Sequence, residues 1–145
     1  MRHAESRIQS ACVRVFRLEH RALAGLFFSI PNGLLTSASQ ARIAVAEGLL
    51  KGAADTFLAV PMIHENAQYH GLFIEFKQED EIWKGGKRTL TRTYQRPEQR
   101  AFQAAVTAQG YAYEVVRSVD EFRALTSAYL GGTYRPRVTL CEKAV

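Results

Sequence analysis

The sequence has little cysteine, no long apolar run and no apolar segment at its start. Only two of the 145 residues are cysteines, Cys12 and Cys141, and they form no C-x-x-C pair. A disulfide framework and a zinc finger are therefore excluded. The apolar stretches fall well short of the ~18 residues that predict a membrane span. Because the first residues are charged and polar, we expect no secretory signal, and a cytoplasmic protein with no membrane partner.

The chain has enough apolar residues for one core, together with a surplus of positive charge. Hydrophobic residues make up 47% of the chain and charged residues 23%, which is typical of folded domains. Lys and Arg number 19 against 14 Asp and Glu, so the net charge is +5. This surplus favours a polyanionic partner such as DNA. We expect residues 1–132 to form a single domain and residues 133–145 to form a tail.

Hydrophobic periodicity and turn residues predict helices alternating with strands. Helices are expected over residues 4–23, 37–48, 96–110 and 118–131, and strands over residues 26–30, 55–60, 72–77 and 111–116. Between them, residues 62–71 predict a polar loop, and residues 78–95 a charged segment with a hairpin tip at Gly85-Gly86. The order α β α β β α β α predicts an α/β fold with a central mixed β-sheet flanked by helices.

The strand over residues 72–77 carries two charged side chains in an apolar setting. Side chains alternate along a strand, so Glu75 and Lys77 project from one face. Asp55 begins the preceding strand, and an antiparallel return of the chain would put it beside Glu75. Two carboxylates at one sheet end suit Mg²⁺ or Mn²⁺, and a nearby lysine can orient a water molecule or stabilise a phosphate. Taken alone, Glu75 and Lys77 are also compatible with a plain ion pair on a half-exposed strand.

Polar residues on two predicted helices are further candidates for the same site. Glu5 and Gln9 are four residues apart and share one helix face, which either looks toward the sheet end or is solvated. Gln99 lies on the helix that starts near Pro97.

Basic residues cluster after the strand that holds Glu75, and the aromatic residues Trp83 and Tyr94 are interleaved with them. The cluster consists of Lys84, Lys87, Arg88, Arg92, Arg96 and Arg100. Such a surface can follow a phosphate backbone and stack on bases, although a solvated hairpin would show the same pattern. Arg7 and Arg14 on the first helix are additional candidate contacts to DNA.

The order of short motifs resembles the VRR-NUC family of virus-type replication-repair nucleases, within the PD-(D/E)XK phosphodiesterase superfamily. The resemblance spans residues 4–130. Its pieces are Glu5-x-x-x-Gln9, Ile30-Pro31-Asn32-Gly33, Glu47-Gly48, Lys51-Gly52-Ala53-Ala54-Asp55, Ile74-Glu75-Phe76-Lys77, Arg96-Pro97-Glu98-Gln99, Gln109-Gly110-Tyr111 and Val115-Val116-Arg117-Ser118. One departure is Ala54, where the family usually has proline.

The resemblance implies metal-dependent phosphodiester hydrolysis by residues at matching positions. It makes Glu5, Asp55 and Glu75 the acidic metal-site residues, with help from the backbone carbonyl of Phe76. It makes Lys77 the catalytic lysine. Gln99 resembles the helix glutamine that reaches the site, with Gln95 as its rival because the segment 78–95 is long.

The function expected on these grounds is that of a Mg²⁺- or Mn²⁺-dependent DNA endonuclease. By resemblance, it would dimerise and prefer Holliday junctions or other branched DNA during replication, recombination or repair. A restriction-type nuclease and a non-catalytic DNA-binding subunit with the same fold are the alternatives. The apolar tail residues Val138 to Leu140, with Tyr129 and Tyr134, predict a homodimer interface.

Overall fold

The computed structural model describes residues 2–32 and 37–137, without the side chains of residues 2, 80–84 and 89–92. The elements in chain order are α1 (Arg2–Glu19), the 3₁₀ helix η1 (Arg21–Leu26), β1 (Phe27–Ser29), α2 (Ala38–Ala46), β2 (Thr56–Leu58), β3 (Met62–His64), β4 (Ala67–Tyr69), β5 (Leu72–Phe76), β6 (Glu79–Lys84), β7 (Lys87–Arg92), α3 (Pro97–Ala108), β8 (Ala112–Val116) and α4 (Val119–Leu130). The tail residues 138–145 lie outside the described ranges. No helix within those ranges has the length and apolar character needed to cross a membrane.

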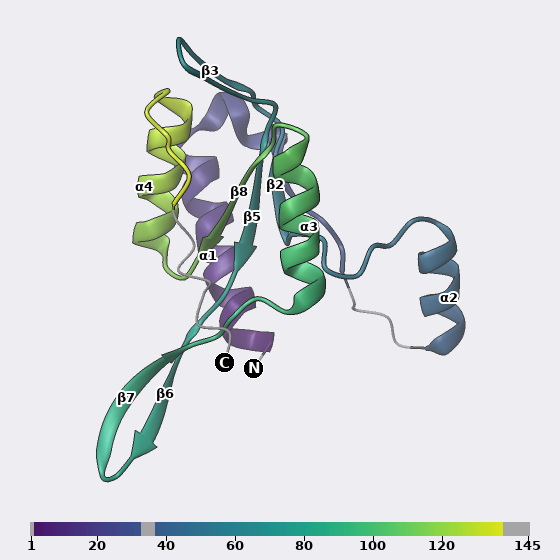
Figure 1. The fold of residues 1–145 in the computed structure, drawn as a ribbon, viewed down its shortest axis with the longest axis vertical. Coiled ribbons are helices and arrows are strands. Elements are labelled where there is room, and N and C mark those ends of the chain that lie inside the picture. Colours follow the sequence, from purple (N-terminus) through teal and green to yellow (C-terminus); the bar gives the residue numbers. More distant parts are fainter. Residues whose placement is uncertain (1, 33–36, 138–145) are drawn as a thin grey trace.

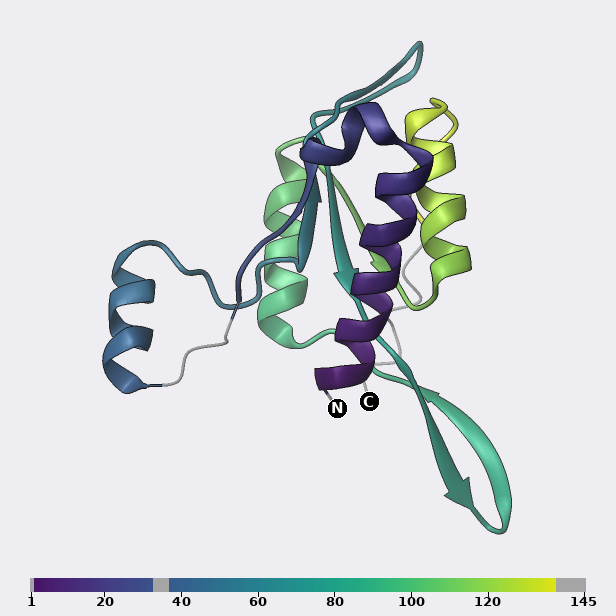
Figure 2. The same cartoon turned by 180° about the vertical axis from the view of Figure 1, so that it is seen from behind.

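A four-stranded mixed sheet forms the centre of the molecule. Its strand order is β1-β2-β5-β8, with antiparallel pairing among the first three strands and parallel pairing between β5 and β8. Helices α1 and α4 cover one face, and α3 covers the other (Figure 1, and from behind in Figure 2). The predicted fold class, a mixed sheet flanked by helices, is therefore confirmed.

The two faces of the sheet bury different side chains. On the face toward α1 and α4, Phe16 of α1 packs against Phe27 and Phe122, with ring centroids 4.9 and 6.4 Å away. On the opposite face, Phe102 of α3 packs against Phe73, at a centroid distance of 5.2 Å. Because alternation along β5 gives one face to Phe73, Glu75 and Lys77, these charged residues lie under α3.

The first helix is shorter than expected. It ends at Glu19 and the chain continues as η1, whereas the sequence pattern predicted one helix over residues 4–23. Among the described side chains of α1, Cys12 and Phe16 are buried, and their spacing of four residues puts both on the helix face that packs against the core. Leu18 is 62% exposed and lies outside this face.

Two hairpins extend the strands beyond the sheet. Residues 62–71, expected as a loop, form the β3–β4 hairpin, in which Met62 is buried and Tyr69 packs against Tyr134. The β6–β7 hairpin projects from the other end of the molecule (Figure 1). Its tip lies at Gly85-Gly86 as predicted, and both glycines have the positive φ that a two-residue hairpin turn requires.

The C-terminal aromatic residues pack inside their own domain. Tyr129 is 1% exposed and donates a hydrogen bond to the carbonyl of Val60 (2.6 Å). Tyr134 is 5% exposed and donates to Oε1 of Glu114 (2.7 Å). The expectation that these tyrosines contribute to a dimer interface is wrong, because both side chains are already buried in the core of their own domain. Residues Val138 to Leu140, the rest of that expected interface, lie outside the described ranges.

Candidate active site

The ends of β2 and β5 bring two acidic residues together. The antiparallel register pairs Thr56 with Ile74, so Asp55 lies opposite Glu75 at the end of the pairing. Oδ2 of Asp55 accepts a hydrogen bond from the backbone N–H of Phe76 (2.7 Å). This hydrogen bond occupies the position that the next backbone hydrogen bond between β2 and β5 would have, and it holds the aspartate at the end of the sheet. The juxtaposition predicted from the hairpin-sized gap between the two strands is present.

Three polar side chains meet beneath α3. Glu75 is 2% exposed and Lys77 is 5% exposed, and Nζ of Lys77 lies 3.7 Å from Oε1 of Glu75. Nε2 of Gln99, on the first turn of α3, donates a 2.7 Å hydrogen bond to the same oxygen. Burying charged groups is costly unless they are paired, and here one carboxylate oxygen receives both partners. The exposed-strand interpretation of the Glu75–Lys77 pair is therefore wrong.

The two oxygens of Glu75 have different surroundings. Oε2 is buried and has no hydrogen-bond partner among the described residues, and the carboxyl group of Asp55 lies close enough to that of Glu75 to interact with it. A hydrogen bond between the two carboxyl groups forms only when one of them is protonated, because an ionised carboxylate can only accept. The pair therefore requires either a shared proton or a cation. A buried orphan oxygen beside a second carboxylate matches the oxygen donor set that Mg²⁺ and Mn²⁺ prefer.

Burial also changes the acid–base properties of the pair. It raises the pKa of Glu75 to about 8, and the negative charge of Asp55 adds to the increase, while the Lys77 ammonium opposes it. Burial likewise raises the pKa of Asp55, against the lowering effects of the Phe76 N–H and Lys77. In the absence of a cation, the raised pKa therefore favours the protonated form of the Glu75 carboxyl. Strongly perturbed carboxyls that face a specific partner mark candidate functional sites.

Glu5 approaches the acidic pair from the first turn of α1. Its charge contributes to the raised pKa of Glu75, so it acts across the sheet end where α1 begins. No group of three or more His, Cys, Asp or Glu residues that could hold a metal ion occurs within the described ranges. Asp55 and Glu75 form the central pair, and Glu5 acts on the charge of Glu75 from the start of α1.

The structure distinguishes the two candidate glutamines. Gln99 contacts Glu75, and its Oε1 accepts a 2.8 Å hydrogen bond from the backbone N–H of Arg96. Gln95 instead donates to Oε1 of Gln103 (3.0 Å) and to the hydroxyl of Tyr113 (3.1 Å). Of the two glutamines, Gln99 is the one that contacts the acidic pair.

Tyr113 belongs to the surroundings of the site, and sequence analysis did not single it out. It is 4% exposed, and its pKa is raised by burial and then by the negative charge of Glu75. The parallel register pairs Tyr113 with Phe73, which places it on the face of the sheet that carries Glu75. Alternation along residues 112–116 would have identified this face, provided that β8 had been known to neighbour β5.

A glycine brings the loop before β2 close to α3. Gly52 has φ +92°, and a Cβ atom there would lie 2.5 Å from the backbone oxygen of Glu98. Lys51, the residue before Gly52, also contacts Glu98: its Nζ lies 3.7 Å from Glu98 Oε1. The close approach fixes the strand that carries Asp55 next to the helix that carries Gln99.

The predicted DNA contacts are distributed over three elements. Arg7 and Arg14 are exposed on α1, Lys87 and Arg88 are exposed at the tip of the β6–β7 hairpin, and Arg96 and Arg100 are exposed at the start of α3. The side chains of Lys84 and Arg92 lie outside the described part of the chain.

The overall arrangement was compared with known proteins. A solved structure described as "VRR_NUC domain protein" matches with a TM-score of 0.67, covering 88% of each chain at 18% sequence identity. The chain has the VRR-NUC fold. No protein-family model and no curated protein matches the sequence. In this VRR-NUC fold, the acidic pair lies where β2 and β5 meet, beneath the start of α3.

Proposed function

We propose that this protein is a divalent-metal-dependent nuclease that hydrolyses phosphodiester bonds in DNA. The observation that carries the proposal is the buried Oε2 of Glu75, which has no donor among the residues that the structure describes, in a carboxylate that interacts with Asp55. The VRR-NUC fold supports the same interpretation. A purely structural ion pair would leave no acidic oxygen unpartnered beside a second carboxylate.

Asp55 and Glu75 would hold Mg²⁺ or Mn²⁺ directly. The N–H of Phe76 points toward Asp55, and because the N–H and C=O of one strand residue point the same way, its carbonyl faces that side as well. This orientation fits the carbonyl of Phe76 as a further ligand. Glu5, whose charge acts on Glu75, would bind the metal directly or through water. A divalent cation in such a site supplies Lewis-acid stabilisation of the charge that develops on a phosphate during hydrolysis.

The remaining residues have roles that follow from their contacts. The Lys77 ammonium, buried next to Glu75, would orient the attacking water and stabilise the developing negative charge on the phosphate. The water oxygen forms a bond to phosphorus, and the ester bond to the leaving oxygen breaks. Gln99 holds the Glu75 carboxylate through its amide group and acts as a positioning residue. The basic residues of α1, the β6–β7 hairpin and the start of α3 would bind the DNA backbone.

The preferred substrate in this proposal is branched DNA, cut by a homodimer. The β6–β7 hairpin projects from the end of the molecule where α1 begins (Figures 1 and 2). The exposed Lys87 and Arg88 at its tip and Arg7 on α1 would therefore contact different arms of a branched DNA. A two-fold dimer would present two sites to symmetric phosphates of a junction. A restriction-type nuclease that reads linear duplex and a non-catalytic DNA-binding subunit remain the alternatives.

A panel of end-labelled four-way junction, flap and matched linear duplex tests the proposal, with Mg²⁺, Mn²⁺ or EDTA. We expect metal-dependent cleavage of the branched molecules in preference to the linear duplex. Sequence-specific cleavage of linear duplex would favour the restriction-type alternative. DNA binding without cleavage under any metal condition would favour the non-catalytic subunit. Light scattering with and without junction DNA tests the dimer, which a single-chain mass in both would contradict.

A further inference from the structure

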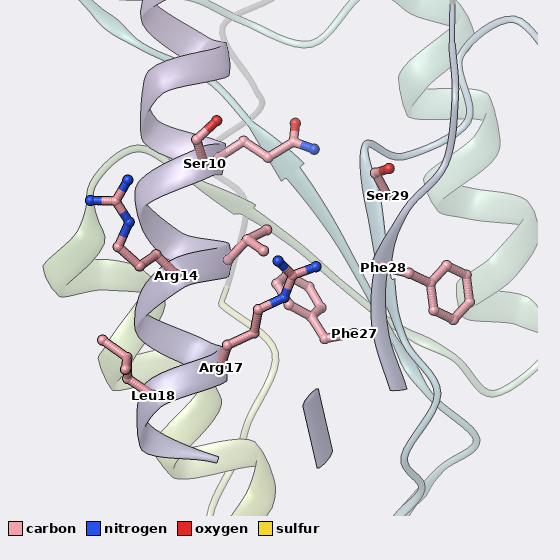
Figure 3. A pocket seen from close by; sticks show the side chains of 9 residues that line it. Ser10, Arg14, Arg17, Leu18, Phe27, Phe28 and Ser29 are labelled. Atoms are coloured by element: carbon pink, nitrogen blue, oxygen red, sulfur yellow. The ribbon is translucent and has the colours of Figure 1, made fainter. Parts of the chain in front are cut away.

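A cleft separates α1 from the edge strand β1, away from the acidic pair. It has a volume of about 500 Å³, and its walls include Gln9, Arg14 and Arg17 from α1 and Phe27 and Ser29 from β1. Figure 3 shows Arg17 extending from the helix toward Phe27 on the strand. None of the proposed catalytic or metal-binding residues lines this cleft, so its occupant requires a separate explanation.

The cleft carries positive charge that the protein does not neutralise. Arg14 and Arg17 are exposed, and neither makes an ion pair or a side-chain hydrogen bond within the described ranges. No Asp or Glu is among the lining residues. Glu19, in the last turn of α1, is already paired with Arg123 at 2.6 Å. Two arginines without partners over a cleft free of carboxylates favour an anionic occupant.

The opposite wall of the cleft offers backbone hydrogen-bonding groups. The Leu26 carbonyl accepts from the N–H of Ala59 (2.8 Å), and the N–H of Ile30 donates to the carbonyl of Asp55 (2.8 Å). Because alternate residues of an antiparallel strand pair with the neighbouring strand, Ser29, between these rungs, directs its N–H and C=O away from the sheet. The hydroxyl of Ser29 adds another polar group on this wall.

The cleft lies on the α1 face of the sheet, and two contacts relate it to the sheet end that carries the proposed active site. The Ile30–Asp55 bond joins the end of β1 directly to the residue that precedes β2. On the other wall, Gln9 lies one helical turn after Glu5 and so shares its side of α1. A chain that follows the cleft toward the start of α1 would therefore reach the sheet end where Glu5 acts on the charge of Glu75.

We propose that this cleft binds the sugar–phosphate backbone of an unpaired DNA strand that leaves the active site. The proposal rests on the proposed nuclease function and specifies its substrate as DNA with a single-stranded arm next to the cleaved bond. The cleft lies between one helix and one strand and has two arginines without partners among the described residues, and a basic groove that follows the backbone is typical of single-strand binding. A second copy is a poor occupant, because two-fold symmetry would bring the arginines against their own equivalents.

The test compares two double variants by fluorescence anisotropy, all in an Asp55→Asn background so that the DNA stays intact. Arg14→Gln with Arg17→Gln removes the charge of the cleft and keeps most of each side-chain stem. Arg42→Gln with Arg135→Gln is the matched control, since both are exposed and lie outside the cleft. Each protein is titrated against a blunt duplex and the same duplex with a single-stranded arm, over a series of salt concentrations.

We expect the parent protein and the control to bind the armed DNA more tightly than the blunt duplex. The cleft variant should lose this preference, and its log–log salt slope for the armed DNA should fall by ~1.4, as expected for two lost contacts to a single strand. Equal binding of both DNAs by the parent, or a preference retained in the cleft variant, would overturn the proposal. If light scattering showed that the cleft variant is a monomer while the parent is a dimer, the cleft would be an interface with a second copy, and the proposal would be overturned. Since binding is measured without cleavage, an absence of nuclease activity would overturn only the proposed function.

Discussion

Gln99 donates a 2.7 Å hydrogen bond from Nε2 to Oε1 of Glu75. The same side chain accepts a hydrogen bond from the backbone N–H of Arg96, so the first turn of α3 is fixed to the buried carboxylate. Because Oε1 also faces Nζ of Lys77, both donors lie on one side of Glu75. Oε2 is buried without a hydrogen-bond partner among the described residues, and this asymmetry marks the candidate metal position beside Asp55.

Replacement of Gln99 by alanine should impair cleavage without removing a metal ligand. We expect a loss of about 10- to 100-fold in metal affinity or activity, which is typical when a group that orients a ligand is removed. Gln95→Ala is the matched control, since Gln95 contacts Tyr113 and Gln103 but not Glu75. Metal titration by calorimetry and single-turnover cleavage would measure the difference. Equal effects of the two substitutions would contradict the positioning role of Gln99.

Replacement of Lys77 by methionine should separate metal binding from turnover. The substitution keeps an unbranched side chain in the buried space but removes the ammonium near Glu75. We expect turnover to fall by roughly 10²-fold or more, because the group that orients water and stabilises charge is lost. Calorimetry should show that metal binding survives. Retained cleavage together with lost metal binding would show that the lysine is structural.

The metal-free protein should become less stable as the pH rises from about 5 to 8. Burial raises the pKa of Glu75 to about 8, whereas an unfolded glutamate titrates near ~4.3. Between these values the folded protein binds a proton that the unfolded chain has released, so its free energy of unfolding falls with increasing pH. The change is roughly 1.4 kcal/mol for each unit of pKa shift.

Glu75→Gln provides the comparison for this pH dependence. Its amide oxygen can accept from Gln99 while its NH₂ group donates toward Asp55, without a titrating proton. Urea unfolding in EDTA should therefore show a flatter pH profile for the variant, and greater stability than the parent at pH 8. Parallel profiles for the two proteins would mean that Glu75 is ionised throughout this range.

Gly52→Ala should destabilise the protein more than Gly48→Ala. Both glycines have positive φ (+92° and +105°), so both substitutions carry a backbone cost of about 1–2 kcal/mol. A Cβ atom at Gly52 would also clash with the backbone of Glu98, whereas nothing lies within 4 Å of one at Gly48. The clash should move the loop before Asp55 away from α3 and reduce cleavage as well. Thermal unfolding and activity assays test this, and equal behaviour of the two variants would contradict the packing described.

The sequence predicted the parts of the site that depend on alternation and on short connections. The shared face of Glu75 and Lys77 and the approach of Asp55 follow from the strand period and an antiparallel return. The choice between Gln99 and Gln95 depends on how α3 is rotated over the sheet, which no local pattern specifies. Tyr113 could be recognised as a neighbour of the site only if β8 were known to lie next to β5, and that contact joins segments far apart in the chain. Tyr134 resembled an exposed tail residue because its partner, Glu114, is buried on a distant strand.

The central claim is that Asp55 and Glu75 hold a divalent cation for DNA cleavage. It is tested most directly by single-turnover cleavage of a labelled four-way junction in Mg²⁺ or Mn²⁺, comparing the parent with Asp55→Asn and Glu75→Gln. Each substitution removes a charge and almost no volume, so circular dichroism and DNA binding should remain at parental levels. The account predicts metal-dependent cleavage by the parent and none by either variant. Full cleavage by either purified variant would contradict it.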